Sequence, residues 1–166
     1  KALPAIVEHE GPVYIRLFRR QAENVFDDDY EFDLGKADLL RDGSDVTLIA
    51  SGVCVANALQ AAETLAQEGV SARVLNIHTI KPIDADAVIK AASETGALVT
   101  AENHNVIGGL GSAVAEVLAE QRPTPLERVG VKDHFGQVGK APYLMGVFGI
   151  TAADIAKAAR KAIARK

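Results

Sequence analysis

The chain has 166 residues, of which 48% are hydrophobic and 24% are charged, and its formal net charge is −4. These values are typical of one globular domain with a short appendage. The acidic balance, the 5% of aromatic residues and the lack of tryptophan disfavour nucleic acid as a partner. No apolar stretch reaches the 18 residues of a membrane span and no secretory signal pattern is present, so we expect a cytoplasmic protein without a membrane partner.

The first thirty residues differ in pattern from the rest of the chain. Gly11-Pro12 marks a turn, and the alternating apolar residues at 13–17 predict a strand. An acidic, polar segment that includes Asp27–Asp29 follows and has too few apolar residues to pack. We therefore expect residues 1–30 to be the tail of a preceding domain plus a linker, and residues 31–166 to form the main domain.

From residue 33 onward, strand patterns alternate with helix patterns. Short apolar runs predict buried strands, and apolar residues three and four apart predict helices between them. The strands are expected at 46–50, 72–77, 97–101 and 126–131, and the helices at 55–69, 84–94, 109–121 and after Thr151, with Asp154 in a capping-box position. This alternation predicts an α/β fold, a three-layer α/β/α sandwich with a mostly parallel sheet. Residues 33–40 are the candidate for a fifth strand, at an edge and antiparallel.

A glycine-rich turn separates one predicted strand from the next helix. It contains Gly108, Gly109 and Gly111, and the free amides of a helix N-terminus are able to bind phosphate or carboxylate. The spacing is not that of a dinucleotide-binding fingerprint, and no Walker lysine is present. Of the two interpretations, we favour a tight turn with close helix–sheet packing over anion binding.

Glu102 and His104 follow the same strand, at its carboxyl end, where open α/β sheets place ligands. They either share a proton in a pocket or fix the loop and face another subunit, and we favour the second role. The other histidines have no companion at metal-ligand spacing, so no metal site is expected. Cys54, the single cysteine, is interpreted as a core residue at a helix start.

Arg16, Arg19 and Arg20 form the densest cationic group, at the end of the strand predicted at 13–17. Guanidinium groups suit phosphate because each donates paired hydrogen bonds to two oxygens. Composition alone would favour a solvated basic loop.

Several motifs resemble, in order and spacing, the C-terminal part of transketolase. They are G-P-V-Y-I-R-L-F-R at 11–19, T-I-K-P-I-D at 79–84, E-N-H at 102–104 with G-G-L-G at 108–111, F-G at 135–136 and F-G-I at 148–150. The resemblance extends to deoxyxylulose-phosphate synthases and to the beta subunits of 2-oxo-acid dehydrogenases. The I-R-x-x-R pattern at 15–19 is more similar to transketolase than to either relative.

The resemblance implies a homodimeric, cytoplasmic enzyme of the pentose phosphate pathway that uses thiamine diphosphate and Mg²⁺. Such an enzyme transfers two-carbon ketol units between sugar phosphates. Residues 1–30 would be the last helix and strand of the pyrimidine-binding domain plus the linker. The family's G-D-G diphosphate motif and its activating glutamate are absent from this sequence. We therefore expect the isolated chain to bind no cofactor, to be inactive, and to need the remaining N-terminal domains as partners.

One substrate residue carries over from the family. Arg19 matches the arginine of I-R-x-x-R that binds the phosphate of the sugar substrate, which favours binding over a solvated loop. Phe18 and Arg20 stand where relatives have a small residue and proline, so Arg20 is the alternative cation. The family's terminal domain mainly builds the dimer, so no catalytic residue is expected here, and the remaining candidates are loop or interface residues: Glu102, His104, Gly108, Gly109 and Gly111.

Three further functions stay open at this point. Two are fragments of the related thiamine enzymes, a deoxyxylulose-phosphate synthase or a 2-oxo-acid dehydrogenase beta subunit. The third is a non-catalytic regulatory module that binds an anion with the glycine-rich turn.

Overall fold

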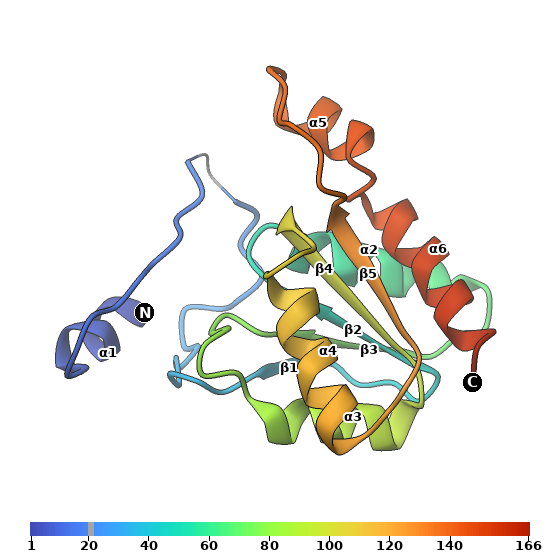
Figure 1. Ribbon diagram of the computed structural model, residues 1–166, viewed down its shortest axis with the longest axis horizontal. Coiled ribbons are helices and arrows are strands. Elements are labelled where there is room, and N and C mark those ends of the chain that lie inside the picture. The colour runs from blue at the N-terminus through green and yellow to red at the C-terminus, as the bar shows by residue number, and fades with distance from the viewer. Residues whose placement is uncertain (20–21) are drawn as a thin grey trace.

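Five strands form one sheet in the computed structural model, which describes residues 1–19 and 22–166 (Figure 1). The sheet order is β1-β3-β2-β4-β5. β1 runs antiparallel to β3 at one edge, and all other neighbours are parallel. The strands are β1 Asp38–Arg41, β2 Val46–Ala50, β3 Ala72–Asn76, β4 Leu98–Asn105 and β5 Leu126–Val131. The predicted mostly parallel sheet with an antiparallel edge strand is therefore confirmed.

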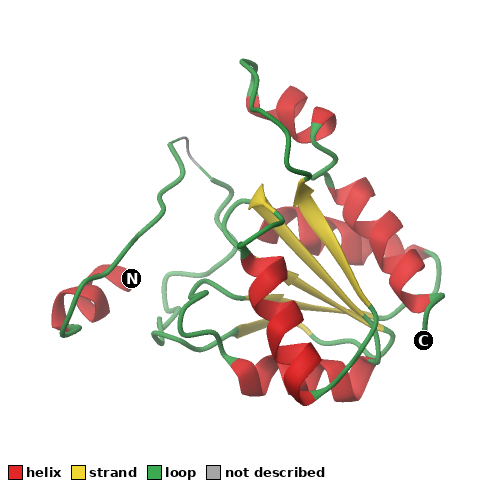
Figure 2. Cartoon of the chain, viewed as in Figure 1, coloured by secondary structure: helices red, strands yellow, loops and turns green. Residues whose placement is uncertain are grey.

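Helices cover both faces of the sheet, as Figure 2 shows. α2 (Cys54–Gln67) and α6 (Ala152–Ile163) enclose one hydrophobic core, and α3 (Ala85–Thr95) and α4 (Leu110–Gln121) enclose the other. β2 is buried at all five positions because it lies in the middle of the sheet with helices on both sides. The three-layer architecture is confirmed.

Side chains cap the starts of α3 and α6, and the cap of α6 is the one predicted from Thr151 and Asp154. The Asp84 carboxylate accepts a hydrogen bond from the Ala87 amide at the start of α3. Thr151 and Asp154 form a capping box at the start of α6, in which each side chain accepts from the other residue's backbone amide. These caps satisfy amides that have no partner within the helix.

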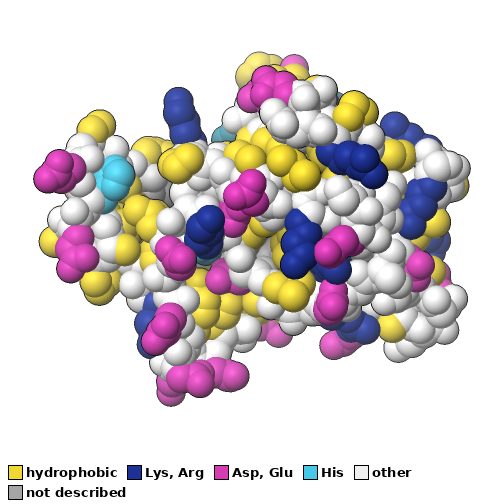
Figure 3. Space-filling view, turned by 90° about the horizontal axis from the view of Figure 1, so that it is seen from below, with side chains coloured by type: hydrophobic (Ala, Val, Ile, Leu, Met, Phe, Trp, Pro, Cys, Tyr) yellow, Lys and Arg dark blue, Asp and Glu magenta, His cyan; other side chains and the backbone are white. Residues whose placement is uncertain are grey.

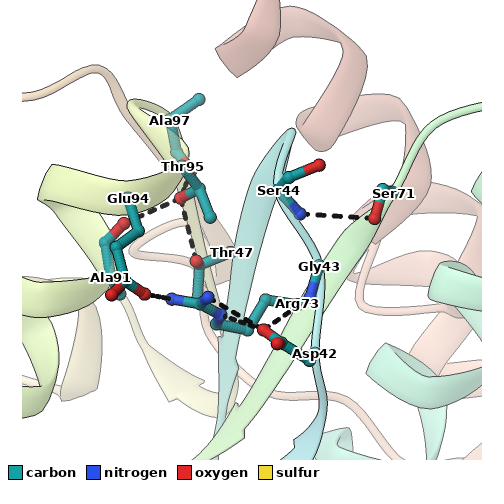
Figure 4. A network of polar contacts seen from close by, with 10 residues as sticks. All are labelled: Asp42, Gly43, Ser44, Thr47, Ser71, Arg73, Ala91, Glu94, Thr95 and Ala97. Atoms are coloured by element: carbon teal, nitrogen blue, oxygen red, sulfur yellow. Dashed lines mark hydrogen bonds and ion pairs between the residues drawn. The ribbon is translucent and has the colours of Figure 1, made fainter.

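A polar network ties strands to helices at the amino-terminal edge of the sheet (Figure 4). The Arg73 guanidinium on β3 pairs with Asp42 at 2.8 Å and with Glu94 on α3 at 2.5 Å. Thr47 is the register partner of Arg73 on the neighbouring strand β2, and its buried hydroxyl lies 2.9 Å from that of Thr95 on α3, which also donates to the Ala91 carbonyl. The hollow above this network measures about 420 Å³, and its charged lining is already paired.

The strand predicted at 13–17 does not form, which is a correction to the sequence analysis. Residues 12–18 have no regular secondary structure (Figure 2), and every residue of the segment 11–19 is exposed to solvent. A strand needs a neighbour to pair its amides and carbonyls, and within the described residues no strand lies beside this segment.

Two short helices were not predicted from the spacing of apolar residues. α1 (Ala2–Glu8) lies apart from the sheet, and α5 (Ala141–Val147) stands beyond the end of β5 (Figure 1). Each has seven residues and buries none of them, so neither has the apolar stripe by which a helix is detected. Only the resemblance to transketolase implies the first of them.

Charged side chains of both signs are interspersed on the face drawn in Figure 3. Exposed ion pairs of the molecule include Arg160 with Glu68, and both Lys161 and Arg165 with Glu127. In the described part of the chain, no helix combines the length and the apolar character needed to cross a membrane.

Candidate functional site

The carboxyl ends of β2 and β4 mark the point where the strand order reverses. From β2 the chain proceeds to β3 on one side, and it then returns to β4 on the other side. Open α/β sheets bind ligands in the crevice at such a reversal. Glu102 to Asn105 at the end of β4 lie at this position.

Glu102 is buried, with 2% of its surface exposed, and its carboxylate is fully engaged within the chain. Oε2 accepts a hydrogen bond from the Leu110 amide and Oε1 accepts one from the Gly111 amide, both at 2.8 Å. These are the first amides of α4, where the helix dipole favours negative charge. The anion that this helix N-terminus binds is thus the chain's own carboxylate.

Close contacts explain two of the glycines, Gly109 through Glu102 and Gly111 through Arg128 and Thr100. A Cβ on Gly109 would overlap Glu102 Oε2 and lie 2.7 Å from the Asn105 carbonyl oxygen, and a Cβ on Gly111 would lie 2.8 Å from Arg128 Cδ. Gly108 has a φ of +74°, and its amide donates to Ser112 Oγ at 2.9 Å. The turn is therefore packed too tightly for a side chain at 109, and a side chain at 111 would require Arg128 and Thr100 to shift.

His104 does not join Glu102 in a common site. Its ring is exposed, and Nδ1 lies 2.9 Å from the carbonyl oxygen of Asn105. The register of β4 against β5 changes here, since β4 advances from Ala101 to Asn105 while β5 advances only from Val129 to Val131. This bulge breaks the alternation of the strand and directs neighbouring side chains to different surroundings.

Asn103 and Asn105 lie on this bulge and contact other parts of the chain. The Arg16 guanidinium donates from Nη1 to Asn103 Oδ1 and from Nη2 to the Asn103 carbonyl, both at 3.0 Å. Asn105 donates from Nδ2 to Asp133 Oδ1 at 3.2 Å and accepts from the Ile107 amide at 2.8 Å. The sequence does not predict either contact, because the residues that they join are 87 and 28 positions apart in the chain.

Arg19 lies three residues after Arg16, at a hollow of about 320 Å³. Phe18 and Arg19 line one side of it, and the other side comes from the segment before α5 and from its first turns: Gln137, Val138, Gly139, Ala141 and Leu144. Arg20, the alternative cation, lies outside the described residues. The two described arginines of this group thus have different surroundings. Arg16 is held at the end of β4, and Arg19 lies beside a hollow.

Cys54 begins α2 in the core, as predicted, and is fully buried. Burial raises the pKa of its thiol to about 12; the negative charge of Glu102 acts in the same direction, and Arg16 opposes it. The thiol is therefore protonated and unreactive at neutral pH.

His78 lies at the other side of the sheet, just after β3. Its ring contacts Phe32 in a tilted arrangement with centroids 4.3 Å apart, and Nδ1 lies 2.8 Å from Thr79 Oγ1. Burial lowers the pKa of His78, and the carboxylates of Asp38 and Asp33 partly offset this effect. Over residues 1–19 and 22–166, no three His, Cys, Asp or Glu side chains gather in a way that could hold a metal ion.

Comparisons with known proteins agree with this architecture. Residues 35–155 match the family model described as "Transketolase, C-terminal domain". A 6-deoxy-6-sulfo-D-fructose transketolase subunit, SqwH, from Clostridium sp. (strain MSTE9) is 57% identical over 165 residues, which are 99% of this chain and 51% of that protein. The 1-deoxy-D-xylulose-5-phosphate synthase 1 of Geobacter sulfurreducens is 39% identical over 99% of this chain and 26% of its own length.

A solved structure, described as a split gene transketolase in an inactive beta4 tetramer, superposes with a TM-score of 0.94 at 47% identity. It covers 98% of this chain, whereas this chain covers 53% of it. The first curated relatives are likewise about twice as long as this chain. The family match over most of the sequence and the shared fold together show that this chain belongs to the transketolase family through its C-terminal domain.

Proposed function

We propose that this chain is the C-terminal section of a thiamine-diphosphate- and Mg²⁺-dependent transketolase that moves two-carbon ketol units between sugar phosphates. The observation that carries this proposal is the position of Arg19 beside an open hollow, within a chain of the transketolase family. The section supplies a substrate-binding arginine and surface for assembly with other domains. The chemical step takes place in the complete enzyme.

The residues of this chain do not fit the cofactor. Glu102 is the one buried carboxylate among the described residues, and both of its oxygens are occupied by amides of α4. It is therefore not free to ligate Mg²⁺ or to contact an aminopyrimidine. Thiamine diphosphate and Mg²⁺ belong, in this proposal, to the remaining N-terminal domains.

Arg19 binds the terminal phosphate of the sugar. A guanidinium donates two parallel hydrogen bonds to a tetrahedral anion and stays charged at all physiological pH values. The hollow beside it is lined by apolar side chains and one amide, which allows the anion to approach without a competing carboxylate in the lining. This contact fixes the end of the sugar that is remote from the reacting carbon.

The N-terminal segment has large apolar side chains that are exposed to solvent. Leu3, Val7, Tyr14 and Leu17 are 68% to 88% exposed, and hydrophobic side chains are visible on the left-hand lobe in Figure 3. An exposed apolar surface of this kind is typical of an interface. We propose that it packs against the preceding pyrimidine-binding domain, that residues 1–30 are the tail of that domain plus the linker, and that the complete enzyme is a cytoplasmic homodimer of the pentose phosphate pathway.

A second candidate substrate is a sugar that ends in a sulfonate. It is favoured by the 57% identity to the Clostridium 6-deoxy-6-sulfo-D-fructose transketolase subunit. A sulfonate presents three oxygens in the same tetrahedral arrangement as a phosphate but carries a single charge. The same arginine would bind either group, so the preference has to be measured.

A deoxyxylulose-phosphate synthase and an anion-binding regulatory module are less well supported. The synthase shares this domain at 39% identity and is distinguished by the activity of the complete enzyme. A module that binds an anion at the glycine-rich turn is disfavoured because Glu102 already occupies the amides of that turn.

Replacing Arg19 tests the proposal. In the complete enzyme, Arg19→Ala removes a charge-assisted contact worth about 1.5–3 kcal/mol, so the KM for a phosphorylated sugar should rise roughly 10-fold or more. Arg122→Ala, which removes an equally exposed guanidinium at the end of α4, should leave KM unchanged. Steady-state kinetics with phosphorylated and sulfonated sugars in parallel would identify the preferred anion. An unchanged KM for both sugars in Arg19→Ala would remove Arg19 from the site.

A further inference from the structure

The hollow beside Arg19 has two walls that lie outside the sheet. One wall is the end of the segment 11–19, and the other is the arm formed by residues 132–147, which leads from β5 into α5. Both walls are exposed; Phe135 and Val138 on the arm are completely accessible to solvent. In Figure 1 the arm extends beyond the carboxyl end of β5. Neither wall is positioned by the hydrophobic cores alone.

Each wall is tied to the end of β4 by one asparagine. Asn103 accepts both hydrogen bonds of Arg16, on the segment that carries Arg19. Asn105 donates to Asp133 at the base of the arm. The two asparagines thus connect both sides of the hollow to one strand end, while Met145 at the far end of the arm packs against the hydrophobic core.

The first tie limits where Arg19 can lie. Three residues of extended chain span about 10 Å, so the contact of Arg16 keeps Arg19 within that distance of the Arg16 backbone. The contact uses two nitrogens of one guanidinium, which fixes its orientation as well as its distance.

The second tie determines how the arm leaves the sheet. Asp133 has a φ of +54° and is the single non-glycine residue with a positive φ in the described part of the chain. This left-handed conformation turns the chain sharply, and aspartate adopts it more readily than most non-glycine residues. The Asn105 amide is oriented for this bond, because its oxygen accepts from the Ile107 amide and its nitrogen therefore faces Asp133.

The end of β4, from which both asparagines extend, is held in place by Glu102. Glu102, between the sheet and α4, is buried and bonded on both oxygens, and it immediately precedes Asn103. The bulge in β4 follows, and it leaves both asparagines half-buried at the strand end. A fixed strand end is thus connected to two exposed segments.

We infer that Asn103 and Asn105 are positioning residues that hold the two walls of the Arg19 hollow around the terminal anionic group of the sugar substrate. This inference rests on the proposed function. Neither asparagine contacts the substrate itself. Replacing either asparagine should therefore weaken binding of the sugar's anionic group, whereas the rate of ketol transfer at the other end of the sugar should change little.

The test uses the same substitution at both positions in the complete enzyme. Asn103→Asp keeps an oxygen acceptor for the Arg16 guanidinium and makes it charged, so the KM for a phosphorylated aldose acceptor should stay within about twofold of the wild-type value. Asn105→Asp places a carboxylate against the Asp133 carboxylate and removes the donor, so the same KM should rise about fivefold or more. In both variants kcat should change less than about twofold.

The alanine variants and a neutral acceptor complete the design. Asn103→Ala and Asn105→Ala should each raise the KM for the phosphorylated acceptor about threefold to tenfold. For the unphosphorylated aldose of the same length, KM should stay constant. A general loss of folding would instead reduce activity with both aldoses. Gln121→Ala, an exposed amide at the far end of α4, is the matched control.

The outcomes separate the inference from the proposed function. If Arg19→Ala reduces the preference for the phosphorylated acceptor but all four asparagine variants keep it, the positioning role is overturned and the proposed function stands. If the wild-type enzyme transfers no ketol unit to any phosphorylated or sulfonated sugar, the proposed function fails and the inference fails with it.

Discussion

At the scale of single residues, Glu102 has the largest consequence for the local structure. A buried carboxylate is costly unless its oxygens accept hydrogen bonds. Here the first amides of α4 supply two, and the helix dipole adds a favourable field. The tight glycine turn exists because the carboxylate lies against the backbone of residue 109.

Gly109→Ala should therefore lower the free energy of unfolding by about 1–3 kcal/mol or more, because the new methyl group would overlap Glu102 Oε2. Gly136→Ala is the matched control, since nothing lies within 4 Å of a Cβ at that position. Urea unfolding of both variants measures the difference. Equal stability of the two would contradict the packing that we describe for the turn.

The sequence identified Glu102 and the glycines as a unit but not their contact. Their place at a strand end and a helix start follows from local pattern, and the packing interpretation of the glycines agrees with the geometry. The partners of Glu102, and the separation of His104 from it, depend on the bulge in β4. A bulge depends on how two strands pair, which a single sequence does not reveal.

At the scale of secondary-structure elements, α3 is fastened to the sheet by a buried pair of hydroxyls. Thr95 on α3 donates to the Ala91 carbonyl one turn earlier and accepts from Thr47 on β2. Both threonines are buried, Thr47 completely and Thr95 with 2% of its surface exposed. Since neither hydroxyl reaches water, the Thr47 hydroxyl depends on Thr95 for its hydrogen bond (Figure 4).

Thr95→Val preserves the shape of the side chain but leaves the Thr47 hydroxyl without a partner. The free energy of unfolding should fall by about 1–3 kcal/mol. Thr64→Val on α2 removes a comparable hydroxyl, which donates to the Gln60 carbonyl four residues earlier, but at an exposed position, and should cost far less. Chemical denaturation distinguishes the two. The double variant Thr47→Val/Thr95→Val should recover part of the loss, and a double variant as unstable as the sum of the singles would speak against the pair.

Elements that bury an apolar face were predictable, and elements that do not were missed. The four sheet-covering helices have apolar residues at helical spacing, so their positions followed from the sequence. α1 and α5 bury nothing, and the alternating residues at 13–17 had no strand to pair with. These three segments lie outside the sheet sandwich, and two of them line or lead to the Arg19 hollow.

At the scale of the whole molecule, the chain combines a finished α/β/α sandwich with exposed segments that point away from it. Within the sandwich, both hydrophobic cores are covered by helices, and the start of α6 is capped by side chains of the same chain. The N-terminal segment and the arm expose large apolar side chains, among them Tyr14 at 88% and Phe135 at 101%. The first curated relatives are about twice as long as this chain, which supports our proposal that further domains complete the active site.

The central claim is that this section contributes substrate binding to an active site that other domains complete. The most direct measurement is ketol transfer from a ketose to a phosphorylated aldose, with thiamine diphosphate and Mg²⁺, by the chain alone and after mixing with the remaining transketolase domains. We predict activity in the mixture and none in the chain alone. Ketol transfer by the isolated chain, or a folded mixture that transfers none, would contradict the account.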